Sequence, residues 1–159
     1  MIRTAFSIAL VLFPMSAQAL SCMRISLPEV YAQVDAAPEP YHLVLGKISL
    51  PKGFVPPGRD QDDLGIPYQV NGTFQGKIGT RQGFITSVRG PIEIDVTCVA
   101  HWCGGISQEE QIYFLAVTDA GYKLSATPCP RVGFSAIAEN IEQAESCLAG
   151  RMCEPIQPR

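Results

Sequence analysis

Apolar and polar residues alternate along much of this chain, and the alternation predicts a mainly β protein. Apolar side chains recur at every second position in residues 92–96 and again in residues 112–116, and a third short run covers residues 122–126. Alternation with a period of two places one set of side chains on the core-facing side of a sheet. We therefore expect strands in these three ranges, with the polar segment 107–111 as a connection.

More strands are expected earlier in the chain. Residues 41–50 are rich in valine and leucine and predict a buried strand, in which Gly46 marks a bulge. Residues 66–78 and 84–88 predict two further strands. A turn at Arg89-Gly90-Pro91 is expected to join the last of these to the strand that begins at residue 92.

Two helices flank the predicted strands. Ser26 and Glu29 have the spacing of a capping box, in which the hydroxyl and the carboxylate each satisfy a backbone N–H, and this predicts a short helix to about residue 37. Ser135 is expected to cap a second helix that runs to about residue 149. The apolar residues of that helix recur at helical spacing and predict a stripe against the sheet. They are Ile137, Ile141, Ala144 and Leu148.

The longest irregular stretch is the loop at residues 51–65, with three prolines, three glycines and three aspartates. A solvated connector is the simplest interpretation. Long loops in small domains often carry function, however, so Phe54 and Val55 are candidate binding residues.

Residues 1–19 have the parts of a secretory signal peptide, namely one basic residue, a short apolar run and a small-x-small ending. Cleavage is expected after Ala19. Cleavage after Ser21 satisfies the same rule and would make Cys22 the first residue of the mature chain. We therefore predict a periplasmic or secreted protein with one domain at residues 20–159.

The charge balance limits the partners of the mature chain. Loss of residues 1–19 removes only Arg3, which leaves 11 basic against 15 acidic residues and a net charge near −4. No basic run is present in the sequence, which argues against nucleic acid and anionic membrane surfaces. No later apolar stretch has the length of a membrane span. A protein or peptide of the cell envelope is the expected partner.

Six cysteines follow the predicted signal peptide, and an even number in an exported chain indicates disulfides. Cys98 with Cys103, and Cys147 with Cys153, are close enough in sequence to close local loops. This leaves Cys22 with Cys129. A bond between Cys22 and Cys103 is the rival pairing.

The sequence contains no complete catalytic or metal-binding motif. His101-Trp102-Cys103 suggests a metal or thiol site, but the chain has only two histidines and no CxxC. GxSxG, HExxH, Walker and GxGxxG sequences are also absent. We therefore expect no enzyme activity, no metal and no cofactor. Trp102 is expected to be a lid on the core, with a binding anchor as the alternative.

The order of these parts resembles the netrin-like domain of the tissue inhibitors of metalloproteinases. The likeness covers most of residues 22–147 and predicts an exported protein of a bacterial type. It implies a disulfide-linked five-stranded OB-type closed barrel with a short N-terminal and a C-terminal helix. The residues that carry it are Cys22, the strand 41–50, the loop 51–63, Cys103-Gly104, the hairpin 112–124 and Thr127-Pro128-Cys129.

In those inhibitors, an N-terminal cysteine chelates the zinc of the protease through its α-amine and carbonyl. By this resemblance Cys22 would be bonded to Cys103. Met23, Arg24 and the turn 99–102, which contains His101 and Trp102, would form the adjoining ridge.

The main functional hypothesis is a non-catalytic binding module of the cell envelope that uses a barrel face or the loops around Phe54 and Trp102. One alternative is a metalloprotease inhibitor of the tissue-inhibitor type. The other is an envelope thiol-redox protein that uses Cys98 and Cys103.

Overall fold

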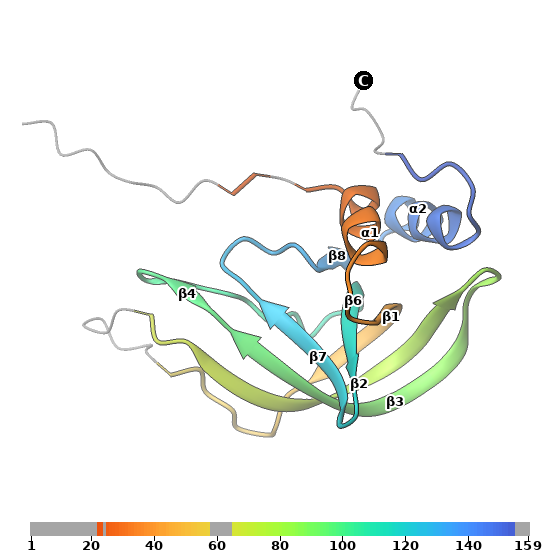
Figure 1. Ribbon diagram of the computed structural model, residues 1–159. Helices are drawn as coiled ribbons and strands as arrows, with labels where there is room; N and C mark the ends of the chain where they lie inside the picture. Colours follow the sequence, from red (N-terminus) through yellow and green to blue (C-terminus); the bar gives the residue numbers. More distant parts are fainter. Residues whose placement is uncertain (1–21, 24, 58–64, 155–159) are drawn as a thin grey trace, which may run out of the picture.

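The computed structural model of the protein describes residues 22–23, 25–57 and 65–154. These residues form two helices and eight strands (Figure 1). The elements are α1 (Leu27–Asp35), β1 (Tyr41–Ser49), β2 (Tyr68–Thr80), β3 (Gly83–Val96), β4 (Cys98–Val99), β5 (Trp102–Cys103), β6 (Gln111–Thr118), β7 (Gly121–Ala126), β8 (Gly133–Ser135) and α2 (Ala138–Leu148). The predicted signal peptide, Arg24 and residues 58–64 lie outside the described residues.

Five of the strands close into a barrel. β1 pairs antiparallel with both β2 and β6, β3 pairs antiparallel with β2, and β7 pairs antiparallel with β6. The circle is completed by a parallel pair between β3 and β7. The predicted fold class is therefore confirmed as a mainly β protein with a closed five-stranded mixed barrel and two helices. The strand order β1-β2-β3-β7-β6 is compatible with an OB-like barrel.

The core lies on both sides of β1 and β6. Val44 and Leu115 point into the barrel, whereas Leu43 and Phe114 point outward, where both helices cover the barrel. Strands that are buried on both faces need apolar residues at nearly every position. This explains why the sequences of β1 and β6 are almost continuously apolar.

A pair of glycines allows β1 and β2 to approach closely. Gly46 and Gly76 are partners in the ladder, and a Cβ atom on Gly46 would overlap the carbonyl oxygen of Gln75. The predicted bulge at Gly46 is wrong, because the β1–β2 register is continuous there. The register shift of the barrel lies between Ile78 and Gly79.

β3 is one long strand, so the turn predicted at residues 89–91 is wrong. β2 pairs with β3 along its whole length, but β7 pairs with it only from Ile92 onward. Thr97 donates to the Ala126 carbonyl of β7, and alternate residues of a strand face the same edge. The backbone of Pro91 therefore faces the β7 side, one residue before the pairing of β3 with β7 begins at Ile92. Because no hydrogen bond to β7 is formed at this position, the missing N–H of proline interrupts no pairing.

The N-terminal helix forms as predicted. The Glu29 N–H donates to Ser26 Oγ at 3.4 Å, and the Ser26 N–H donates to the Glu29 carboxylate at 2.7 Å. α2 begins differently, after Ile137, whose side chain makes no capping hydrogen bond. Ser135 belongs to β8, and only its carbonyl reaches the helix, as the acceptor for Asn140.

The six cysteines form three disulfides, Cys22–Cys129, Cys98–Cys103 and Cys147–Cys153. This is the pairing predicted from sequence distance. The rival bond between Cys22 and Cys103, which the family resemblance implies, is wrong. Among the described residues, no helix has the length and apolar character needed to cross a membrane.

Candidate functional site

The loop after β1 and the β4–β5 hairpin meet at one end of the barrel. The Gly65 N–H donates to the Ala100 carbonyl at 2.9 Å. Gly65 also lies so close to the hairpin disulfide that a Cβ atom there would be 2.7 Å from Cys103 Sγ. The structure therefore brings together the two regions that contain the predicted residues Phe54 and Trp102.

The hairpin is tight and covalently closed. Cys98 and Cys103 are ladder partners joined by a disulfide, with their Cα atoms 4.0 Å apart. Ala100 in its turn has a φ of 51°, which is unfavourable for a residue with a side chain. Val99 and Trp102 are the second ladder pair, so their side chains lie on the same face.

Four apolar side chains at this end of the barrel are open to solvent, and we call them the apolar patch. Trp102 is 60% exposed and Val99 56%, while Val55 and Ile66 on the loop are 67% and 48% exposed. The interpretation of Trp102 as a lid on the core is therefore wrong. Exposed apolar side chains that gather in one region are typical of interaction sites.

Phe54 anchors the loop behind the patch. Its ring packs on that of Tyr68 with a centroid distance of 5.9 Å. Both rings line a cavity of about 400 Å³ between the loop and the segment that follows β5, which we call the loop cavity. Cys103, which follows Trp102 in the hairpin, also lines the loop cavity. The hairpin disulfide therefore lies between the loop cavity and the apolar patch.

A second cavity of about 420 Å³, the wall cavity, lies between β7 and β8. Tyr113, Leu124 and Val132 give it an apolar lining. Gly105 and Ile106 line both cavities, which are therefore neighbours. Among the residues that the structure describes, neither lining contains a charged side chain. The volumes are those of ordinary ligand sites, and the lining suits an uncharged group.

The tyrosines in the cavities are not suited to act as general bases. Burial raises the pKa of Tyr113 to about 12, and its hydroxyl donates to the Ser107 carbonyl at 3.3 Å. Burial also raises the pKa of Tyr68. Both hydroxyls stay protonated near neutral pH, so they can donate hydrogen bonds but cannot act as bases.

None of the remaining predicted residues is one of the four patch residues. Met23 is 90% exposed, and Cys22 is held by its bond to Cys129, three residues beyond the end of β7. That end reaches the hairpin region, because the Thr97 N–H donates to the Ala126 carbonyl. His101 is exposed in the hairpin turn. Cys22 therefore lies at the same end of the barrel as the hairpin, but it is not bonded to it.

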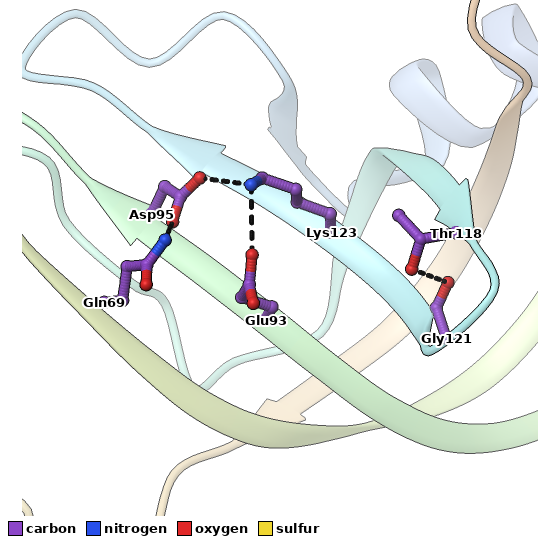
Figure 2. A network of polar contacts seen from close by, with 6 residues as sticks. All are labelled: Gln69, Glu93, Asp95, Thr118, Gly121 and Lys123. Carbon is purple, nitrogen blue, oxygen red and sulfur yellow. Dashed lines mark hydrogen bonds and ion pairs between the residues drawn. The ribbon is translucent and has the colours of Figure 1, made fainter.

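A polar network on the outer face of β2, β3 and β7 serves the barrel itself (Figure 2). Lys123 Nζ lies 2.6 Å from Asp95 Oδ2 and 3.0 Å from Glu93 Oε1, and Gln69 donates to Asp95. The hydrogen bond from Lys123 lowers the pKa of Asp95, and the bond to Asp95, with that to Glu93, raises the pKa of Lys123. The network therefore links the parallel pair β3 and β7. Thr118 Oγ1 closes the adjacent β6–β7 turn by donating to the Gly121 carbonyl.

The part of the chain that the structure describes contains no group of three or more His, Cys, Asp or Glu residues that could hold a metal ion. Comparison with known protein families, curated proteins and solved structures found no match for this chain. The site is therefore interpreted from its own geometry. Sequence reasoning missed the wall cavity. The one feature of the sequence that could have indicated the wall cavity is Tyr113, whose side chain ends in a hydroxyl although it lies in a strand that is buried on both faces.

Proposed function

We propose that this chain is an exported, non-catalytic binding module of the cell envelope that holds a protein or peptide through the apolar patch and the loop cavity. The observation that carries the proposal is that four exposed apolar side chains lie on two segments that are hydrogen-bonded to each other through Gly65 and Ala100. Tryptophan is among the residues that contribute most to protein interfaces, so Trp102 is the expected centre of the contact.

Specific contacts hold the segments that carry the patch. The Cys98–Cys103 disulfide closes the hairpin, Phe54 packs on Tyr68, and the Gly65 N–H is bonded to the Ala100 carbonyl. Ordering of loops and side chains is one of the costs of association. Segments that are already held in place avoid part of that cost, which supports recognition by this surface.

Export is proposed from the N-terminal segment and the cysteines. Three disulfides and the predicted signal peptide are compatible with a periplasmic or extracellular protein. The closed barrel supports the kinship to netrin-like domains, which we keep as part of the proposal. The inhibitor alternative loses support, because Cys22 is bonded to Cys129 and not to Cys103.

The test is capture of a partner from an extract of the cell envelope of the producing cells, with the oxidised mature chain as bait. Trp102→Ser should lower the yield of a specifically captured protein at least tenfold, because hot-spot residues contribute about 2 kcal/mol or more. Ile137→Ser is the matched control, since Ile137 is similarly exposed at 53% but precedes α2. Equal capture by both variants, or no specific capture by the parent chain, would contradict the proposal.

A further inference from the structure

β7 is paired along only half of one edge. Its first residues pair with β6, from Gly121 opposite Thr118 to Lys123 opposite Ala116. At residues 111–113, the edge of β6 that faces β7 further along pairs with β8 instead. Residues 124–126 of β7 therefore pair with β3 alone among the described strands.

The free edge at this point carries the backbone groups of Ser125. The Ala126 carbonyl accepts from the Thr97 N–H at 2.9 Å and so faces the β3 side. Consecutive residues of a strand direct their backbone groups to opposite edges. The N–H and C=O of Ser125 therefore face away from β3, and no strand of the described chain pairs with them.

The wall cavity lies beside this edge. Ser125 of β7 and Thr127, which follows β7, line it on one side, and Gly133 and Ser135 line it from β8 on the other side. The segment around Ile106 borders it as well. A strand edge in such a recess can be reached by one extended chain, but another sheet could not pair with it edge to edge.

The chemistry of the recess defines its ligand. A free N–H and C=O on a strand edge are matched by the backbone of another extended chain. The described part of the lining carries no charged side chain, and Tyr113, Leu124 and Val132 in it belong to the hydrophobic core or pack against it. A charged side chain would lose its hydration there without gaining a partner, whereas an apolar side chain would be buried.

We propose that the wall cavity binds an extended, uncharged peptide segment of a partner as an added strand along residues 124–127, at the end of β7, with an apolar side chain directed toward Tyr113. This inference goes beyond the proposed function, because it uses none of the four patch residues. The proposal for the apolar patch and the proposal for the wall cavity can therefore be refuted independently of each other.

The test uses the oxidised mature chain and four capped pentapeptides that alternate threonine with alanine, valine, leucine or phenylalanine. Addition of at least one peptide should shift the amide NMR signals of residues 124–127 and 133–135, and should slow hydrogen exchange of the Ser125 amide at least tenfold. Absence of any shift with all four peptides, or shifts confined to the patch, would overturn the proposal.

Two N-methylated analogues of the best peptide test the backbone contacts, one methylated at the threonines and the other at the alternate residues. N-methylation removes the backbone N–H donors along one edge of the peptide, so at least one analogue should bind at least tenfold more weakly. If both analogues bind as well as the parent peptide, the added strand is refuted. This measurement needs no change in the protein.

Gly133→Val tests the location. A Cβ atom on Gly133 would contact the Tyr113 ring at 3.4 Å, so the larger side chain narrows the cavity. Peptide binding should fall at least tenfold in this variant and stay unchanged in the control variant Ile85→Ser, because Ile85 is 56% exposed on β3 and lines neither cavity. Loss in Trp102→Ser alone would place the peptide on the patch and overturn the proposal.

Discussion

Removal of the Cys22–Cys129 disulfide should destabilise the protein far more than removal of Cys98–Cys103, although both bonds lie at the same end of the barrel. The change is Cys→Ala at both positions of one bond at a time. None of these four cysteines belongs to the buried core, so the cavities left by the missing sulfur atoms contribute little to the difference.

The expected sizes follow from the loops that the bonds close in the unfolded chain. The sequence separations are 107 for Cys22–Cys129 and 5 for Cys98–Cys103. The chain-entropy relation gives about 4.8 kcal/mol for the long loop and about 2 kcal/mol for the short one. The difference, about 2.7 kcal/mol, depends only on the ratio of the two lengths, because the constant part of the relation cancels.

The assay is equilibrium unfolding in urea at pH 7 without reductant, followed by far-ultraviolet circular dichroism. The Cys147–Cys153 pair closes an equally short loop, with a separation of 6, but Cys147 is a buried core residue, so its replacement should cost more than that of Cys98–Cys103 by the cavity it leaves. Comparable losses for the long and short loops would refute the entropic argument. A larger loss for Cys98–Cys103 would instead indicate that the hairpin disulfide supports native contacts, such as those of Gly65.

Three more predictions concern the barrel. Gly46→Ala should lower the free energy of unfolding by about 1–3 kcal/mol, because the new Cβ would overlap the backbone of β2, whereas Gly105→Ala should leave thermal unfolding unchanged. Tyr113 has a pKa of about 12 in the fold, so the unfolded chain loses this proton first and the free energy of unfolding falls from about pH 10 to 12. Tyr113→Phe should make this fall shallower when urea midpoints are measured against pH. An unchanged slope of midpoint against pH would contradict the assignment. The pKa of Asp95 is lowered in the fold, so its contribution to stability is present above the unfolded pKa near 4 and is lost as pH falls through the folded pKa. Lys123→Met should reduce the free energy of unfolding at pH 7 and make its decrease at acidic pH less steep. A decrease at acidic pH as steep as that of the parent protein would exclude this linkage.

The parts of the fold that depend on neighbouring residues could be predicted from the sequence. The capping box needs only Ser26 and Glu29, and two disulfides join cysteines five and six residues apart. The last pair, Cys22–Cys129, then follows by elimination. The five barrel strands could also be predicted, although β3 was divided in two, because each carries its alternation or its apolar run within a few residues. The short strands β4, β5 and β8, of two or three residues each, were not predicted.

The parts that depend on distant partners were missed. Gly90 and Pro91 have the composition of a turn, but β2 holds them in an extended strand along its whole length. Ser135 has the side chain of a helix cap, but pairing with Gln111 places it in β8. In both cases long-range pairing overrides the local preference.

The same contrast applies to the candidate site. Phe54 and Trp102 could be selected because each is a large side chain in a connecting segment. Their common location depends on the contact of Gly65 with Ala100, which local sequence does not encode. The wall cavity arises where β6 changes its partner from β7 to β8, and no single segment carries that information.

The long disulfide also constrains the order of events during biosynthesis. When the proposed exported chain enters an oxidising compartment N-terminus first, the first thiol to appear after Cys22 is Cys98, and Cys103 follows it, so oxidation in order of appearance would join the wrong residues. β6, which closes the barrel against β1, is complete before Cys129 emerges. Native cross-linking therefore requires either that Cys22 remains reduced until the barrel has closed, or that a thiol–disulfide isomerase corrects the early bonds.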